Sequence, residues 1–225
     1  MVDLAIVVVN YNTKDLTLKC IDSIYKSKPK STFEIWLVDN NSVDDTVFKT
    51  EKLFPKVNII RSNKNLGFAG GNNLALKTAS AKNYLLLNSD TEVINGVIDR
   101  LLEFTQNNNF AITSCRLIDK NRNFQPNAGE LPNFATVITW LSGLDDIFRK
   151  FFSLPSYQER SRNYYEKDGR VGWGGGTAMM IKNELIKKIG YFDDKIFMYG
   201  EDVEFCLRAE KFGYKTGWTK TGEIM

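Results

Sequence analysis

A short apolar run that ends in an acid constrains this chain more than any other stretch. Three leucines follow Tyr84 with no polar residue among them, and Asn88, Ser89 and Asp90 come directly afterwards. The run is too short for a helix, so it predicts a strand buried on both faces in the middle of a parallel sheet. Because ligands of open α/β sheets bind outside the carboxyl ends of the strands, we expect Asp90 in that crevice.

The polar residues after this strand suit a divalent cation bound together with a phosphate. An aspartate with neighbouring oxygen ligands leaves positions on Mg²⁺ or Mn²⁺ that phosphate oxygens can fill. The alternative is structural, since Asp90 or Ser89 can be the N-cap of the next helix, where both residue types are common. The sequence leaves both interpretations open.

Strands and helices alternate along most of the chain. Apolar runs predict further strands at residues 4–9, 33–38, 57–60, 111–115 and 178–181. Helical spacing, caps and breakers predict helices from Thr13 to the residue before Pro29, up to Leu53, up to Ala79, from Val93 to Gln106, from an N-cap at Asn183 to Gly190, and from Glu201 to Gly213. Leu16 and Phe212 are placed on buried helix faces. This alternation predicts an α/β fold with a mostly parallel sheet flanked by helices.

Composition narrows the class of protein. A chain of 225 residues with 43% hydrophobic residues can bury a full core, and we expect one domain. The net charge is +3 and basic residues are interspersed with acids, so no nucleic-acid partner is expected. Cys20, Cys115 and Cys206 are odd in number and lie among apolar neighbours, which favours reduced packing thiols.

The sequence also predicts a cytoplasmic protein. No run approaches the roughly 18 apolar residues that span a bilayer, and the N-terminus has no secretory signal pattern. The chain contains no histidine, which excludes a histidine base and any histidine-ligated metal within these residues. Its chemistry must therefore depend on carboxylates.

Glycine-rich stretches follow two of the predicted strands. Residues 63–73 contain three glycines before a helix, which permits close backbone approach to a phosphate. Neither the dinucleotide nor the P-loop glycine pattern is present there, so a plain turn is the alternative. Residues 171–177 combine glycines with Trp173.

Further on, Glu201 and Asp202 begin a helix, where the helix dipole stabilises carboxylates without any catalytic role.

The segment Thr136 to Phe152 predicts one more helix. Its aromatic and aliphatic residues recur at helical spacing, and Arg149 and Lys150 lie near its end. Packing against the core explains such a pattern. An alternative is that the helix lies in a membrane interface, which would give the protein peripheral contact with the inner face of the membrane.

Taken together, six short motifs in this order resemble family 2 glycosyltransferases, and the similarity is greatest to rhamnosyltransferase-like enzymes of bacterial surface polysaccharides. The motifs are residues 10–12, 38–42, 65–72, 87–90, 174–180 and 198–202. The resemblance implies a GT-A fold, Rossmann-like, in which residues 1–115 bind the nucleotide sugar and residues 116–225 bind the acceptor. It also implies a nucleotide-diphosphate sugar donor, Mg²⁺ or Mn²⁺, a saccharide or lipid-linked acceptor, and inversion at the anomeric carbon.

The resemblance implies roles for individual residues. Asp39 matches the acid that hydrogen-bonds the nucleobase; Asn10, Tyr11 and Asn12 match the turn that lines this base. Donor-holding positions correspond to Asn65, Gly67, Asn88 and Ser89, and the metal ligand corresponds to Asp90. The family's Asp-x-Asp motif has an amide, Asn88, in place of its first acid, which implies a modest metal affinity.

Catalytic and acceptor positions are implied in the same way. Asp202 matches the catalytic base, with Glu201 as its neighbour, and Trp173, Gly174 and Gly175 match the acceptor side. Family members commonly supply a further metal-site histidine after a late strand, and this chain has none, so we expect the sequence to be truncated.

Two alternatives from other classes stay open. A nucleotidyltransferase would need a glycine-rich basic loop after the first strand, and residues 10–13 contain no glycine. A non-catalytic protein that only binds a nucleotide sugar or scaffolds a complex is compatible with Asn88 and with the missing histidine.

Overall fold

A large mixed sheet forms the centre of the molecule in a computed structural model that describes residues 1–94, 96–143 and 156–225. Within these described ranges the sheet has nine strands, in the order β3-β2-β1-β4-β10-β5-β11-β8 with β6 paired to β5, and β7 pairs with β9 in a separate small sheet. The strands are β1 (Val2–Asn10), β2 (Phe33–Asp39), β3 (Asn58–Arg61), β4 (Ala81–Asn88), β5 (Ile112–Ile118), β6 (Phe124–Gln125), β7 (Ala128–Gly129), β8 (Gly169–Val171), β9 (Trp173–Gly174), β10 (Ala178–Lys182) and β11 (Thr216–Ile224).

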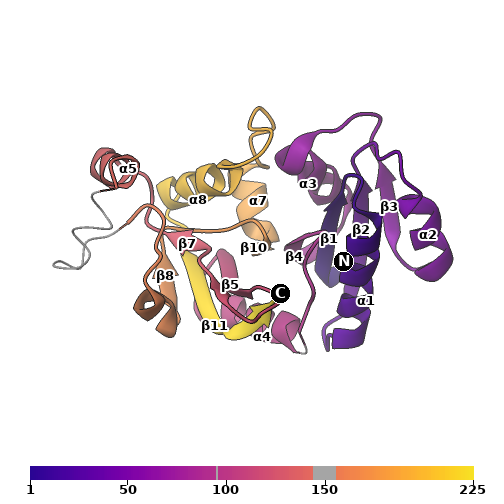
Figure 1. Ribbon diagram of the computed structural model, residues 1–225, viewed down its shortest axis with the longest axis horizontal. Coiled ribbons are helices and arrows are strands. Elements are labelled where there is room, and N and C mark those ends of the chain that lie inside the picture. The colour runs from indigo at the N-terminus through magenta and orange to yellow at the C-terminus, as the bar shows by residue number, and fades with distance from the viewer. Residues whose placement is uncertain (95, 144–155) are drawn as a thin grey trace.

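Helices cover both faces of this sheet (Figure 1). They are α1 (Lys14–Ser27), α2 (Thr46–Leu53), α3 (Gly67–Thr78), α4 (Val97–Asn107), α5 (Phe134–Leu141), α7 (Asn183–Ile189) and α8 (Glu201–Lys211), with a 3₁₀ turn η1 at Arg162–Glu166. The fold class expected from the sequence, a mostly parallel α/β sheet flanked by helices, is confirmed.

Side-chain alternation along the strands explains the layers. In β1, Leu4 and Ile6 belong to a core that also contains residues of α1 and α4, whereas Ala5 and Val7 belong to a second core with residues of α3, α7 and α8. Because successive strand residues point to opposite faces, an unbroken apolar strand must be covered on both sides.

The strand β4 is buried on both faces as predicted, but one of its neighbours runs the other way. It pairs in parallel with β1 and antiparallel with β10. The parallel part of the sheet continues through β2 and β3, and β5 pairs in parallel with β11. The carboxyl ends of β1, β2 and β4 therefore meet at one edge, where the sequence places its polar clusters.

The helix after β4 begins later than predicted, and its start tests whether Ser89 or Asp90 is an N-cap. Gly96, in the left-handed conformation, occupies the N-cap position of α4, and Val93 instead forms a bridge with Ile224. Neither Ser89 nor Asp90 caps this helix. The structural interpretation of these two residues is therefore wrong.

Three details of the predicted helices are also wrong. Leu16 and Phe212 are exposed, at 38% and 53%, because Leu16 lines a cavity at the carboxyl ends of the strands and Phe212 lies just beyond the end of α8. Asn183 does not cap α7; its side-chain amide donates to the carbonyl of Ala81, and Lys182 occupies the cap position.

The predicted helix at Thr136 to Phe152 is described only in part. The part of it that the structure describes is α5, which starts at Phe134 with a reciprocal capping box between Asn133 and Thr136 and ends at Leu141, so Ser142 and Gly143 do not continue the predicted helix. The predicted positions from Leu144 to Phe152, including Arg149 and Lys150, lie outside the described residues.

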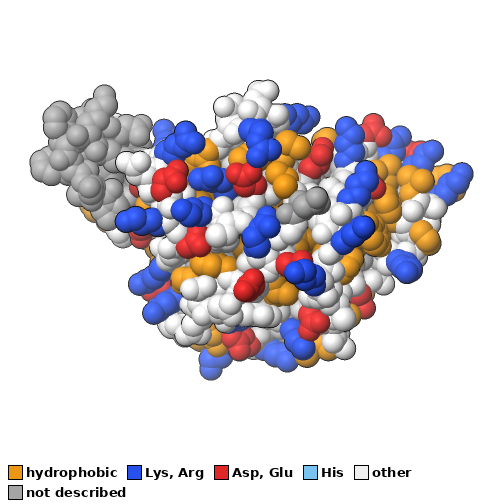
Figure 2. Space-filling view, turned by 90° about the horizontal axis from the view of Figure 1, so that it is seen from below, with side chains coloured by type: hydrophobic (Ala, Val, Ile, Leu, Met, Phe, Trp, Pro, Cys, Tyr) orange, Lys and Arg blue, Asp and Glu red, His pale blue; other side chains and the backbone are white. Residues whose placement is uncertain are grey.

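The distribution of surface charges and the state of the three cysteines agree with what the sequence predicted. Figure 2 shows lysines and arginines interspersed with acids on the face that it presents. Cys20, Cys115 and Cys206 are free and buried, and burial raises the pKa of each thiol to about 12. In the part of the chain that the structure describes, no helix has both the length and the apolar character to cross a membrane.

Candidate active site

A cavity of about 770 Å³ opens where the carboxyl ends of β1 and β4 meet the first turns of α3 and α8. Most predicted site residues line it: Tyr11, Asn65, Gly67, Asn88, Ser89, Asp90, Trp173, Gly175, Glu201 and Asp202. Four do not contribute to its wall: Asn10, Asn12, Asp39 and Gly174. The sheet therefore brings residues from both ends of the chain to one place, as expected for a crevice at strand ends.

The turn after β4 is fixed by its neighbours. The backbone N–H of Asn88 donates to the carbonyl of Thr177, 3.0 Å away, and the side-chain hydroxyls of Ser89 and Thr13 are also 3.0 Å apart. Thr91 closes the turn by donating its hydroxyl to the carbonyl of Asn88. Asp90 is exposed and lies in the cavity wall, so its carboxylate is accessible to a ligand.

Parallel pairing of β1 and β2 sets Asn10 opposite Asp39. The Asn10 amide nitrogen donates to Asp39 at 3.0 Å and to Ser42 at 2.8 Å, and its amide oxygen accepts from the hydroxyls of Thr13 and Thr17. Asn10 is fully buried and Asp39 is 6% exposed. The buried Asn10 side chain therefore fixes the orientation of the Asp39 carboxylate. Of residues 10–12, Tyr11 lines the cavity, and it is 48% exposed.

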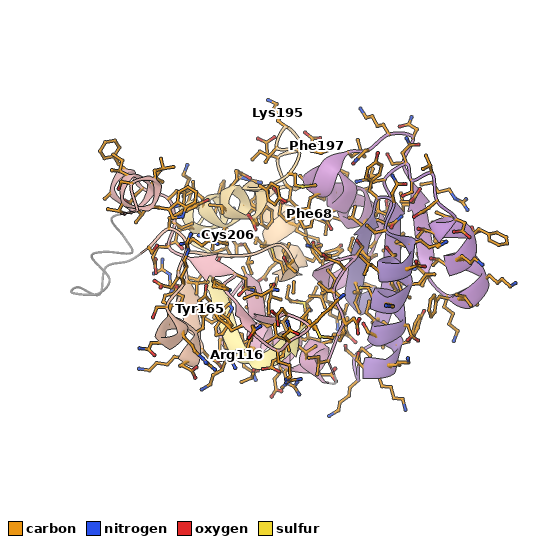
Figure 3. All side chains as sticks on the ribbon, in the orientation of Figure 1. Phe68, Arg116, Tyr165, Lys195, Phe197 and Cys206 are labelled. Atoms are coloured by element: carbon orange, nitrogen blue, oxygen red, sulfur yellow. The ribbon has the colours of Figure 1, made fainter. Side chains whose placement is uncertain are left out.

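The glycine-rich start of α3 contacts the loop that leads into α8. Gly67 has a φ of +69°, and a Cβ built on it would lie 2.1 Å from the carbonyl oxygen of Phe197. The N–H of Phe68 donates to this same carbonyl at 3.0 Å. Phe68 and Phe197 are labelled in Figure 3. The Gly67 N–H is bonded to the Asn65 side chain. The amides of Gly67 and Phe68 therefore have protein partners, which agrees with the plain turn that the sequence left open as the alternative to phosphate binding.

Two acids begin α8 in different surroundings. Asp202 accepts the N–H of Gly176 at 2.9 Å through Oδ2 and the N–H of Val203 at 2.8 Å through Oδ1. Glu201 is 6% exposed, and its Oε2 has no hydrogen-bond partner among the described residues. Burial raises the pKa of both carboxyls above the ordinary values, although the two backbone N–H groups oppose this shift at Asp202.

The second glycine-rich stretch, residues 171–177, contacts Asp202 and also contributes Trp173 to an aromatic wall made of Trp140, Tyr157 and Trp173. Gly174 faces Ser114 so closely that a Cβ would lie 2.3 Å from its hydroxyl, which keeps it out of the cavity wall. Trp173 donates its indole N–H to the carbonyl of Tyr157 at 2.7 Å. The Tyr157 ring lies between those of Trp140 and Trp173, at centroid distances of 5.2 and 5.9 Å.

Several site residues were not identified from the sequence. Gly176 orients Asp202 through its backbone, a role that leaves no side-chain signal. Tyr157 and Asn127, which lie outside the predicted helices and strands, also line the cavity, and so does Trp140 from the helix predicted at Thr136 to Phe152. Asn127 is 6% exposed and bonds the indole N–H of Trp218 and the carbonyl of Cys115. No local pattern in the sequence marks Asn127, because its burial and its partners depend on distant residues.

The donor set fits a hard cation that a ligand helps to bind. Asp90 offers an accessible carboxylate, and the side chains of Asn88 and Ser89 add oxygen atoms beside it. Across the described ranges no group of three histidine, cysteine or acidic residues could hold a metal alone. Phosphate oxygens would therefore have to complete the coordination.

Known proteins with related sequences are enzymes of glycan assembly. The chain is 27% identical over 219 residues to the low-salt glycan biosynthesis hexosyltransferase Agl10 of Haloferax volcanii, covering 96% of this chain and 64% of that protein. It is 22% identical over 205 residues to the N-acetylglucosaminyl-diphospho-decaprenol L-rhamnosyltransferase of Mycobacterium tuberculosis, covering 85% and 65%. The chain thus spans slightly less than two thirds of the length of these relatives.

Solved structures show the same fold at low identity. Staphylococcus aureus TarS, residues 1–349, superposes with a TM-score of 0.65 at 18% identity, over 99% of this chain and 59% of that chain. GalNAc-T7 with UDP, GalNAc and Mn²⁺ gives a TM-score of 0.72 at 14% identity, over 100% and 43%. These similarities establish the GT-A fold that the motifs implied.

The family follows from a match over most of the sequence. Residues 5–190 match the model of glycosyl transferase family 2, a range that includes the turn after β1, the Asn88–Asp90 turn and the glycine-rich strand β9. The chain therefore belongs to glycosyl transferase family 2.

Proposed function

We propose that the protein transfers a sugar from a nucleotide-diphosphate donor, with inversion, to a saccharide or lipid-linked acceptor in surface polysaccharide synthesis. The observation that supports this most is that Asp90, after β4, and Asp202, at the start of α8, line one cavity. A hexosyltransferase and a rhamnosyltransferase are among the relatives, so a hexose or rhamnose is the proposed sugar. The proposal treats residues 1–225 as one catalytic domain.

Asp202 is the proposed base. A sugar hydroxyl is a poor nucleophile, so a carboxylate must accept its proton as the new bond forms. Each carboxylate oxygen has two lone pairs, so Oδ2 can accept the N–H of Gly176 and still accept a proton from the acceptor. Burial raises the pKa of Asp202, which strengthens it as a base.

The donor occupies the other side of the cavity in this proposal. Asp39, oriented by Asn10, hydrogen-bonds the nucleobase, and Tyr11 and Asn12 line the base. Asn65, Gly67, Asn88 and Ser89 hold the rest of the donor. Asp90 and the oxygen atoms beside it hold Mg²⁺ or Mn²⁺. When bound, such a cation neutralises charge on the departing diphosphate.

The aromatic wall is proposed to hold the acceptor. Trp173 and Gly175 line the cavity together with Asp202, Gly174 lies between them in the chain, and the N–H of the next residue, Gly176, donates to Asp202. On the exposed face of α5, Phe134, Ile138 and Leu141 are 85%, 44% and 71% exposed. We propose that this face gives the protein peripheral contact with the cytoplasmic face of a membrane, where a lipid-linked acceptor would be presented.

A panel of nucleotide sugars tests this function. Ligands that bind the native state raise the melting temperature, so UDP-, dTDP- and GDP-sugars are compared with and without Mn²⁺. We expect stabilisation by one nucleotide class, larger with Mn²⁺, and slow donor hydrolysis by the same class. No stabilisation by any nucleotide sugar would contradict the proposal.

A second candidate is a protein that binds a nucleotide sugar without turning it over. The observation that favours it is Asn88, an amide beside the proposed metal ligand Asp90. Binding with no hydrolysis and no transfer to any acceptor would select this candidate.

A further inference from the structure

Glu201 is a carboxylate whose surroundings do not complete its hydrogen bonding. Its side chain is 6% exposed, yet the residue lines the cavity. Its Oε2 atom is buried and has no donor among the residues that the structure describes. The next residue, Asp202, differs, since each of its two oxygens accepts a backbone N–H.

Such an atom is costly unless a ligand supplies a donor. Leaving a buried acceptor without a hydrogen bond costs free energy, and the cost is larger for a charged group. Burial and the charge of Asp202 raise the pKa of Glu201 and outweigh its own backbone N–H, which favours the charged carboxylate, so the cost is not offset. A donor inside the cavity would remove the penalty.

We propose that Glu201 binds a hydroxyl group of a sugar in the cavity and thereby determines which sugar is accepted. This proposal rests on the proposed function, which brings sugars to this cavity. A neutral hydroxyl needs one acceptor oxygen, and Oε2 provides one.

Glu201 is a specificity-determining residue in this account, distinct from the base. Adjacent residues on a helix point about 100° apart, so the two carboxylates cannot face the same atom. The Gly176 N–H fixes the direction of Asp202, and a Cβ built on Gly176 would lie 3.8 Å from the Cβ of Asp202. Glu201 therefore reaches a different part of the sugar from the reacting hydroxyl.

Calorimetry on four proteins tests the proposal. The parent, Glu201→Ala, Glu201→Gln and the control Glu184→Ala are titrated with UDP, dTDP, UDP-glucose and dTDP-rhamnose. Glu184 is a matched control because it is an exposed acid in the first turn of α7. We expect equal binding of UDP and dTDP by all four. We expect Glu201→Ala to bind the nucleotide sugar at least about tenfold more weakly, the lower range for a hydrogen bond to a charged group.

Two further comparisons separate this role from a structural one. Glu201→Gln keeps an acceptor oxygen, so it should retain most of the sugar affinity that Glu201→Ala loses. Monodeoxy analogues of the bound sugar identify the recognised hydroxyl, because the analogue lacking it should bind the parent and Glu201→Ala equally. A merely structural effect would weaken the deoxy and parent sugars to the same extent.

The source of the hydroxyl is distinguished by a second arm. Methyl glucoside and methyl rhamnoside serve as acceptors, and the KM for each is measured. If Glu201→Ala binds the nucleotide sugar tenfold more weakly than the parent, the recognised hydroxyl belongs to the transferred sugar. If only the acceptor KM rises tenfold, the hydroxyl belongs to the acceptor. Unchanged values in both arms would overturn the proposal, as would a Glu201→Gln variant with normal sugar binding but no transfer. If the parent binds no nucleotide or nucleotide sugar, the proposed function fails and this inference fails with it.

Discussion

Replacing Gly67 with alanine would test how the two sides of the cavity are held together. Gly67 combines a φ of +69° with a Cβ position 2.1 Å from the carbonyl oxygen of Phe197. That carbonyl also accepts the N–H of Phe68 at 3.0 Å. An added methyl group would push the Phe197 carbonyl away, and Phe197 lies in the loop that leads into Glu201 and Asp202.

Three contributions set the size of the effect. A left-handed backbone costs a residue with a Cβ about 1 kcal/mol or more. Relieving the overlap with Phe197 costs about 1 to 3 kcal/mol, as for other overpacked sites, and losing the hydrogen bond from Phe68 costs about 1 kcal/mol. With about 1 to 2 kcal/mol for the backbone, we therefore expect Gly67→Ala to lower the free energy of unfolding by about 3 to 6 kcal/mol in total.

Urea denaturation measures this loss against a control that has only the first contribution. Gly213 has a φ of +82° and no atom within 4 Å of a built Cβ, so Gly213→Ala should cost only about 1 to 2 kcal/mol. Where Gly67→Ala folds, transfer should fall more than nucleoside diphosphate affinity, because the displaced loop carries the base. Equal losses of stability in the two variants would refute the importance of the Phe197 contact.

Other predictions concern the donor, the base and the membrane. Asp90→Ala should remove the Mn²⁺-dependent part of nucleoside diphosphate binding in calorimetry and leave the fold intact; unchanged metal dependence would rule out this ligand. Asp39→Ala should weaken nucleoside binding by about tenfold even without metal, for loss of a charged hydrogen bond, and equal binding would contradict that role. A base must be deprotonated, so the transfer rate should rise with pH through the raised pKa of Asp202 and then level off. An acid limb at the ordinary aspartate pKa would contradict the effect of burial. Phe134→Glu/Leu141→Glu should reduce co-sedimentation with anionic liposomes, whereas equal sedimentation would remove α5 from the membrane contact.

Local patterns predicted the elements well where an element depends on its own residues. The apolar run at Tyr84 to Leu87 is a central strand because each face of it must be covered. Its antiparallel neighbour β10 was not predictable, since local sequence does not encode which distant strand pairs or in which direction. The helix was predicted to start at Val93 because Val93 and Val97 have helical spacing. This start was wrong, since Val93 forms a β-bridge with Ile224.

The site shows the same division between local and distant information. Motifs located the turns at Asn88 to Asp90 and at Glu201, and the sheet brings them to one cavity. The hydrogen bond from Asn10 to Asp39 depends on strand register across 29 residues, which no local pattern specifies. The free oxygen of Glu201 depends on the packing of its surroundings, so only the structure could distinguish it from Asp202.

The transfer rate of Asp202→Asn is the most direct test of the proposed mechanism. Asparagine keeps the size of the side chain and one oxygen for the Gly176 N–H, but it cannot accept the proton. We predict that binding of the nucleotide sugar persists while transfer falls by at least about a hundredfold, the low end for loss of a general base. Near-normal transfer by Asp202→Asn, measured beside an inactive Glu201→Gln, would show that the other carboxylate is the base.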